Sequence, residues 1–370
     1  GVHFVFASEP KALFTSGIVK KNLNKSALFE FFCRLTPPYL ETLFDGVYEL
    51  EPGTWLQMEI DGNSRQGVYY ELETAWTELD EDSIPTEKDD LVRLLDCKLA
   101  ESVSRQLVSD VPVGISLSGG IDSGLIMHYM DKTYDSTMLH AFTYSNMTGQ
   151  DEAESARSFI KKGQRELQHH VLPVFLKTHL DSFGHVTNLF DAPVIYPSSS
   201  PIFEVAKSAR KNGIKVLLGG QGSDELFMGY ARYGHWNKLL TGIEDVDQWT
   251  KYFYFGGGIN NVRYVELMTG ISRDIAESSP VWSWVRRNWS LPPLKRMILF
   301  DQRFRLLYLL KRDDRMGMGN SVENRVPFLD KELLTWVNAV PEKWKMQNGK
   351  QKYLLNCLAE RILPKGMAWK

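Results

Sequence analysis

The stretch Val111–Met130, VPVGISLSGGIDSGLIMHYM, determines how the rest of this chain is interpreted. Its first part, Val111–Leu117, is short, apolar and rich in β-branched residues, which is typical of a buried strand. Residues Gly124–Met130 have the pattern of the beginning of a helix. The sequence therefore predicts a strand and a helix that are joined by a short turn, Ser118–Ser123.

The joining turn, SGGIDS, has the composition of a phosphate-binding loop. Gly119 and Gly120 let backbone N–H groups approach an anion without interference from a Cβ atom, and the helix N-terminus adds a partial positive charge. The loop matches neither the Walker pattern nor the dinucleotide fingerprint. Because Asp122 would place a carboxylate beside phosphates, we expect Mg²⁺ between them. A plain structural turn is the alternative interpretation.

The sequence after this loop alternates predicted strands and helices. Strands are expected at Leu139–Tyr144, His169–Val174 and Ile214–Leu218, and helices at Glu87–Leu107, Glu152–Lys162, Lys177–Phe190 and Ile202–Lys211. This order predicts an α/β fold, with a parallel sheet that carries helices on both faces. Ligands of such sheets bind at the carboxyl ends of the strands, where the SGGIDS loop lies.

A second glycine-rich loop, Gly219–Glu225 (GGQGSDE), also lies between an apolar strand and a predicted helix, Leu226–Tyr230. Two such loops would face each other at one edge of the sheet. Asp122 and Asp224 could then hold one Mg²⁺. The alternative for Asp224 is an acidic residue that only stabilises a helix N-terminus.

The residues before the sheet domain have a different character. Strands are expected at Val2–Ala7, Thr42–Leu50 and Pro52–Met58, and a helix at Lys25–Arg34. We expect residues 1–75 to be an α+β fragment too small for a complete core, 76–86 to be a linker, and 87–370 to be the main domain. The chain starts at Gly1 within an apolar run and is expected to be a piece of a longer protein.

The C-terminal part is predicted to be mostly helical. Its tryptophans at 236, 249, 282, 284 and 289 are expected to be core residues. The stretch 313–330 combines charges with an apolar turn, and an ion pair, either Glu323–Arg325 or Asp330–Arg315, could hold a helical hairpin there. Lys352 precedes a helix, where a cation is disfavoured, so either an anionic ligand or plain solvation explains it. Tyr252–Asn261 has no assigned role.

Composition limits the classes of function. The chain has 370 residues, 43% hydrophobic and 24% charged, with a net charge of −3. The chain lacks the basic excess that would favour nucleic-acid binding. It also has no apolar run long enough for a membrane span, so a cytoplasmic protein is expected. The three cysteines, Cys33, Cys97 and Cys357, show no metal-binding spacing and are expected to be buried thiols.

Together these motifs resemble the glutamine-dependent asparagine synthetase family, whose SGGxDS loop is that of the N-type ATP pyrophosphatases. The resemblance rests on SGGIDS, Asp151–Ala153, Asp191–Pro193, Pro197–Pro201, GGQGSDELFMGY, DRMGMGNSVENRVPFLD and KYLL, in that order. FASEPKALF, TLFDGVYELEPGTWL and VYYEL resemble the closing part of that family's glutaminase domain. The resemblance implies an adenine nucleotide α-hydrolase-like fold.

The resemblance also implies a mechanism: a carboxylate attacks the α-phosphate of ATP, and an amine then displaces AMP to form an amide. The residues carried over for nucleotide binding are Leu117, Ser118, Gly119, Gly120, Asp122, Ser123, Tyr144, Gly219 and Gly220. Asp122 and Asp224 would hold Mg²⁺. Lys352 would neutralise charge at the reacting centre. Gln221 and Asp122 would be the other catalytic residues.

Aspartate is the expected acid, and ammonia derived from glutamine is the expected amine. An upstream glutaminase part would supply this ammonia. A homodimer is a further possible partner arrangement. Two departures from the family pattern, Gln221 in place of a glutamate and Ala192 within Asp191–Pro193, place aspartate in doubt. No cysteine here occupies the place of the glutaminase nucleophile. The alternatives are a cyclase or amide ligase similar to β-lactam synthetases and lasso-peptide cyclases, and a nucleotide-binding scaffold without catalysis.

Overall fold

The computed structural model describes residues 3–34, 39–80, 83–134, 138–146, 154, 156–157, 159, 166–194, 196–240, 242–254, 265–267, 270 and 280–369. The chain divides into two compact units. Unit 1 comprises Gly1–Leu72, Asp191–Ile195 and His235–Met297, and unit 2 comprises Glu73–Phe190, Tyr196–Gly234 and Ile298–Lys370. Among the described residues, no helix combines the length and the apolar character that a membrane span requires.

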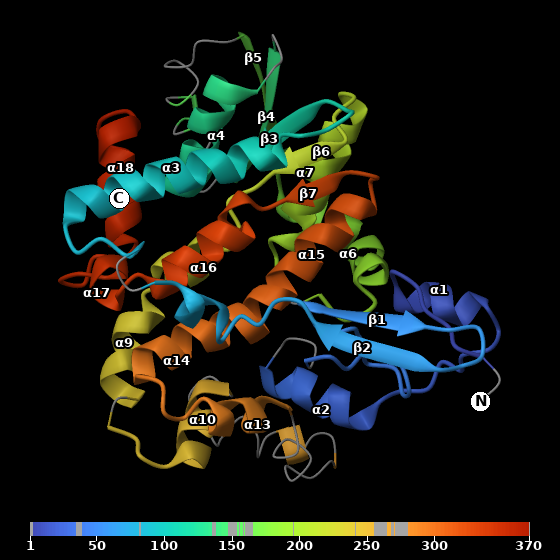
Figure 1. The fold of residues 1–370 in the computed structure, drawn as a ribbon. Helices are drawn as coiled ribbons and strands as arrows, with labels where there is room; N and C mark the ends of the chain where they lie inside the picture. Colours follow the sequence, from blue (N-terminus) through green and yellow to red (C-terminus); the bar gives the residue numbers. More distant parts are fainter. Residues whose placement is uncertain are drawn as a thin grey trace. The chain divides into compact units, whose positions relative to one another are not determined.

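Unit 2 is built on a 5-stranded sheet of order β5-β4-β3-β6-β7, in which every strand pair is parallel (Figure 1). The strands are β3 (Val113–Ser116), β4 (Met138–Asn146), β5 (Glu166–Val174), β6 (Val216–Leu218) and β7 (Glu323–Arg325). Chain order runs outward from β3 in both directions, and this reversal between β3 and β6 creates a crevice at their carboxyl ends. The expected parallel α/β sheet is confirmed.

The helices of unit 2 cover both faces of this sheet. They are α3 (Lys88–Gln106), α4 (Ile121–Thr133), α6 (Leu176–Phe190), α7 (Ser199–Lys211), α8 (Ser223–Phe227), α15 (Leu306–Met318), α16 (Lys331–Ala339), α17 (Glu342–Lys345) and α18 (Tyr353–Ile362), with the 3-10 turns η1 (Ala75–Glu78) and η4 (Pro327–Leu329) and the π-helix η3 (Asp301–Arg305). Leu218 of β6 packs in a core with α3, α4, α16 and α18, whereas Leu217 faces α7. Side chains alternate across a strand, so β6 serves both cores.

Several sequence-based boundaries in unit 2 need correction. The strand expected at Val111–Leu117 is shorter, and α4 begins at Ile121 rather than Gly124. The stretch 313–330 is no helical hairpin: α15 is followed by β7 and η4. Glu323 does pair with Arg325, at 2.8 Å, but on a strand and with the Glu323 side chain 55% exposed. The helix expected at Glu152–Lys162 lies largely outside the described residues.

Unit 1 contains a small two-stranded antiparallel sheet and short helices. Its elements are α1 (Pro10–Thr15), α2 (Lys25–Arg34), β1 (Thr54–Met58), β2 (Ser64–Val68), α10 (Val246–Tyr254), α13 (Pro280–Arg287) and the greater parts of α9 (Arg232–Leu240) and α14 (Pro293–Phe300). The helix at 25–34 is confirmed. Residues 3–7 form no strand, and Phe44 and Tyr48 make only isolated bridges, so those two strand predictions are wrong.

The aromatic and cysteine predictions have mixed outcomes. Trp249, Trp282 and Trp284 are buried as expected, and the guanidinium of Arg296 lies 3.7 Å from the Trp289 ring. Among the cysteines, Cys33 and Cys357 are buried, but Cys97 is exposed, which corrects the expectation of three buried thiols. Part of the unassigned stretch 252–261 belongs to α10, and the remainder lies outside the described residues.

Asp330 is the N-cap of α16 and gives a testable prediction. Its carboxylate accepts hydrogen bonds from the N–H of Glu332 and Leu333, and from Arg105 of α3 at 2.9 and 2.7 Å. We expect Asp330→Ala to lower the free energy of unfolding by about 1–2 kcal/mol, because it removes the cap and the ion pair. Chemical denaturation measures this loss; an unchanged midpoint would contradict it.

The same residue predicts how stability varies with pH. Partial burial pushes the pKa of Asp330 up, but Arg105 and the capping N–H groups outweigh it and hold the pKa below the usual 3.8. This stabilisation is therefore complete above about pH 3.8 and is lost as pH falls through the lowered value. Asp330→Asn, which keeps a capping side chain, should flatten this acid limb of the stability curve.

Candidate functional site

The SGGIDS loop connects β3 to α4 and is held closed by its two serines. The backbone N–H of Ser118 donates to Ser123 Oγ at 3.1 Å, and the two hydroxyl oxygens are 3.1 Å apart. Gly119 has a φ of 72°, a backbone conformation that favours glycine. The loop therefore turns sharply from the strand into the N-terminus of α4, the geometry expected of an anion cradle.

The GGQGSDE loop lies against the first loop. It follows β6, where the N–H of Gly219 donates to the carbonyl of Arg325 at 2.8 Å. A Cβ atom on Gly220 would lie only 3.0 Å from the Cβ of Asp122, so the two loops approach closely at this glycine. The prediction that the two loops face each other at the sheet edge agrees with this contact.

Asp122, Asp224 and Lys352 form a single charged cluster. The ammonium of Lys352 lies 2.6 Å from Asp122 Oδ2 and 2.9 Å from Asp224 Oδ1. The hydroxyl of Ser223 donates to the other oxygen of Asp122, at 2.8 Å. Two carboxylates from different loops thus share one cation.

Lys352 reaches this cluster because of an unusual backbone. It is the residue before α18, with a φ of 48°, and its N–H donates to the carbonyl of Phe227 at 3.1 Å. Its side chain passes close to Gly229, where an added Cβ would overlap Asp224 Oδ1 and Lys352 Cε. A left-handed conformation at a lysine is costly and is typical of functional positions.

The charge states of the cluster follow from its burial and its partners. Burial disfavours the ammonium of Lys352, but Asp122 and Asp224 outweigh it, so its pKa lies above the usual 10.5. Burial, the largest influence on Asp224, raises its pKa above 3.8, and Asp122 adds to this, while Lys352 opposes it. The site thus holds a fixed cation between two carboxylates.

Behind this cluster, a buried polar network supports α8. Tyr230 donates to Glu225 Oε1 at 2.7 Å, and burial raises the pKa of Glu225 to about 7 despite that hydrogen bond. In the π-helix, the fully buried Asp301 accepts from Arg232 at 2.7 Å and Arg305 at 2.8 Å. Single π-helical turns occur often near functional sites.

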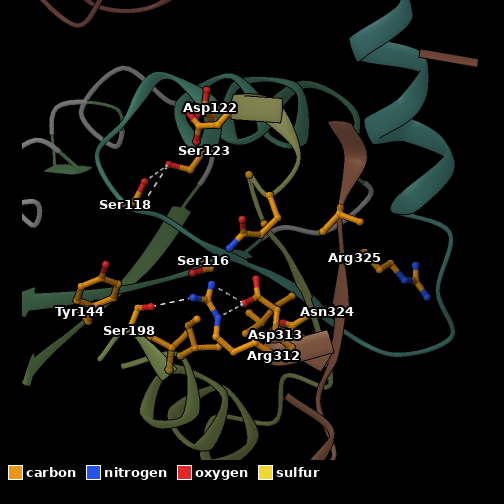
Figure 2. Close-up of a pocket in the computed structure, with 18 residues that line it drawn as sticks. Ser116, Ser118, Asp122, Ser123, Tyr144, Ser198, Arg312, Asp313, Asn324 and Arg325 are labelled. Atoms are coloured by element: carbon orange, nitrogen blue, oxygen red, sulfur yellow. Dashed lines mark hydrogen bonds and ion pairs between the residues drawn. The ribbon is translucent and has the colours of Figure 1, made fainter. Parts of the chain in front are cut away.

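A cavity of about 250 Å³ opens at the carboxyl ends of the strands (Figure 2). It is lined by Ser116, Ser118, Asp122, Ser123, Tyr144, Ser198, Ile202, Val205, Leu217, Gly219, Gly220, Gln221, Asp224, Arg312, Asp313, Asn324, Arg325 and Val326. Figure 2 shows Ser118, Asp122 and Ser123 at one end, and Ser198, Arg312 and Asp313 at the other. The cavity therefore has two chemically distinct ends.

The structure gathers most of the sequence-predicted site residues around this cavity. Eight of them line it: Ser118, Asp122, Ser123, Tyr144, Gly219, Gly220, Gln221 and Asp224. Leu117 and Gly119 flank it, and the Leu117 carbonyl accepts from the hydroxyl of Thr143 at 2.6 Å. Lys352 reaches it through the two aspartates. The assigned roles of these residues stay predictions.

Sequence reasoning missed Arg312, and the second end of the cavity with it. Arg312 is only 5% exposed, and it lies in α15, next to Asp313. The available signal was the charged run Lys311–Arg315, which directly follows the apolar start of this helix. Ala192, by contrast, packs against Ala27, Phe31 and Leu43 and does not line the cavity.

Known proteins resemble this chain over both of its parts. The family model described as asparagine synthase matches residues 94–370, and the glutamine amidotransferase domain model matches residues 1–70. The asparagine synthase match covers the phosphate loop, the second loop and Lys352.

Curated relatives agree with these matches. The chain is 27% identical to glutamine-hydrolyzing asparagine synthetase 1 of Bacillus subtilis over 97% of this chain and 60% of the relative. It is 30% identical to asparagine synthetase 2 of the same organism over 91% of this chain and 46% of the relative. The chain thus spans about half the length of the curated relatives that it matches. Because the asparagine synthase model covers most of its residues, this chain belongs to the asparagine synthase family.

Proposed function

We propose that this chain forms amide bonds by ATP-dependent activation of a carboxylic acid. The observation that carries the proposal is the cluster of Asp122, Asp224 and Lys352 beside a glycine-rich loop at a strand end. In the proposed reaction, a carboxylate oxygen attacks the α-phosphorus of ATP and pyrophosphate leaves. An amine then attacks the acyl carbon, and AMP leaves with the former carboxylate oxygen.

Mg²⁺ fits the residues at this site. Asp122 Oδ2 and Asp224 Oδ1 both lie within 3 Å of one ammonium nitrogen, so the two carboxylates already converge on a shared cation. Among the described residues, no group of three or more His, Cys, Asp or Glu could hold a metal alone. Mg²⁺ commonly binds through one or two carboxylates and substrate phosphates, which matches this donor set. When bound, it would neutralise charge on the departing pyrophosphate.

The protein's own residues have separate tasks in this proposal. The backbone N–H groups of the SGGIDS loop bind phosphate oxygens, and the backbone of Leu117, Tyr144, Gly219 and Gly220 positions the adenosine. Lys352 supplies a fixed positive charge where negative charge develops in the transition state. Its ion pairs with Asp122 and Asp224 hold the ammonium beside the two loops, and it would turn toward the phosphates when Mg²⁺ takes these carboxylates.

For the substrates, we propose aspartate with ammonia derived from glutamine, which would make the product asparagine. The named relatives are glutamine-hydrolyzing asparagine synthetases, and residues 1–70 match a glutamine amidotransferase domain. The glutaminase part would then lie in a segment upstream, with domain boundaries at residues 75 and 87.

The three cysteines are free thiols, which suits the cytoplasm.

Gln221 favours one alternative within the same chemistry. It lines the cavity, and its amide cannot act as a general base. A ring-forming or other amide ligase of the same family, which uses a different acid and no ammonia, is therefore the second candidate.

The test is to separate AMP from ADP after incubation of the full chain with ATP, Mg²⁺, ammonium and aspartate. Aspartate-dependent AMP and asparagine are expected. AMP that forms with other acids but not with aspartate would favour the ligase. A protein that binds ATP and Mg²⁺ but forms AMP with no acid would contradict the proposal and indicate a scaffold.

Gly229→Ala gives a prediction about the cluster itself. The added methyl group would collide with Asp224 and with the Lys352 side chain, so we expect acid-dependent AMP formation to fall about 10- to 100-fold. Gly184→Ala on α6 is the matched control, since a Cβ there meets nothing within 4 Å. Equal activity of the two variants would contradict the close packing.

A further inference from the structure

The end of the cavity away from the phosphate loop is a built polar site. Arg312 Nε and Nη2 donate to Asp313 Oδ1 at 3.1 and 3.0 Å, and Nη1 donates to Ser198 Oγ at 2.8 Å. Both charged side chains are largely buried, at 6% and 13% exposure. A buried pair of this kind is costly unless each charge is well partnered.

This pair keeps unused hydrogen-bonding capacity that faces the cavity. A guanidinium carries more N–H donors than the contacts to Asp313 and Ser198 use. Asp313 accepts from Arg312 through one oxygen only, and a carboxylate has further lone pairs. The cavity end therefore offers a donor and an acceptor of opposite charge side by side (Figure 2).

The start of α7 adds to the donor side. Ser198 is the N-cap of this helix and lines the cavity. The positive end of a helix beside a guanidinium favours a carboxylate.

We propose that Arg312 and Asp313 are specificity-determining residues that bind the far end of the acid, and that this end is a zwitterionic amino acid head group. Its carboxylate binds Arg312 and its ammonium binds Asp313. This inference rests on the proposed function, and it adds to it the residues that select the acid.

Charge and position both support a zwitterion. Asp313 already neutralises Arg312, so a second carboxylate without an ammonium would add an uncompensated charge to a buried site. Gln221 lies between the two ends, because it follows Gly219 and Gly220 in the loop and its side chain contacts Asp313. An acid held at Arg312 thus extends past Gln221 toward the phosphate loop.

The experiment measures acid binding without turnover. The full chain is saturated with Mg²⁺ and α,β-methylene-ATP, and calorimetry compares aspartate with succinate, and glutamate with glutarate. Each pair differs only by the amino group. We expect at least one amino acid to bind about tenfold or more tightly than its partner. Arg312→Lys should weaken amino acid binding about tenfold and leave nucleotide affinity within about twofold.

Asp313→Asn should bring the members of each pair within about threefold, because it removes the negative charge that pairs with the ammonium. Arg210→Lys is the control: Arg210 is exposed in the last turn of α7 and does not line the cavity. It should leave acid binding unchanged.

Three outcomes would overturn the inference: succinate and glutarate binding as tightly as the amino acids, no acid binding to the nucleotide complex, or variants that alter nucleotide affinity alone. A separate assay of AMP formation by the unmodified chain distinguishes these from failure of the proposed function. If acids support AMP formation but the preference for amino acids over the matching dicarboxylic acids does not depend on Arg312 and Asp313, only this inference is wrong.

Discussion

Replacing Lys352 with methionine should lower acid-dependent AMP formation by about 10²- to 10³-fold, the usual effect of removing one preorganised charge from a reacting centre. Methionine keeps the length and the apolar stem of lysine but has no ammonium. The loss should appear in kcat more than in the KM for ATP, because the charge is needed most when negative charge develops in the transition state.

The matched control is Lys350→Met, two residues earlier. Lys350 is exposed, and its ammonium lies 4.8 Å from the Trp369 ring. It has no role in the proposed reaction. It should keep AMP formation within about twofold of the unmodified chain. Lys352→Arg should not rescue activity, since a planar guanidinium does not replace a compact ammonium. Full activity of Lys352→Met, with an unchanged melting temperature, would contradict the role of Lys352 in stabilising the transition state.

The second large effect is expected from Asp122→Asn and Asp224→Asn. Each change removes one of two carboxylates that converge on a shared cation. We expect the Mg²⁺ concentration for half-maximal binding of an ATP analogue to rise at least about tenfold, and AMP formation to fall about 10³-fold. Calorimetric titration of Mg²⁺ with the analogue present measures the first effect apart from turnover.

An exposed acid provides the control for these variants. Asp181→Asn lies on α6, outside the cavity, and should change neither quantity. If Asp122→Asn and Asp224→Asn bind Mg²⁺ and the analogue as the unmodified chain does, neither carboxylate holds the metal. In that case the pair would serve only to orient Lys352.

Ala192 shows that a short sequence motif can mislead about where a residue lies in the fold. Gln221 and Ala192 are both departures from the family pattern and were both expected near the acid. Only Gln221 lines the cavity. Ala192 packs in unit 1 instead. A short motif indicates a residue type at a turn, but it does not show which neighbours surround that turn.

The sequence by itself determined the parallel sheet, the two glycine-rich loops and the position of Lys352 before a helix. These features depend on local chemistry: strand-forming runs, glycines at turns and a lysine where a helix begins. The false strands at 3–7 and 42–50 arose because an apolar run alone does not provide a hydrogen-bonding partner.

Only the tertiary structure decided which side chains meet. The contact of Lys352 with Asp122 joins residues 230 positions apart, and the contact of Arg312 with Ser198 joins residues 114 positions apart. Such contacts depend on how β3, β6, α15 and α18 pack, and packing is a property of the whole core. The acid-binding end of the cavity therefore could not be predicted from the sequence. The phosphate loop could be predicted, because it is a local structure.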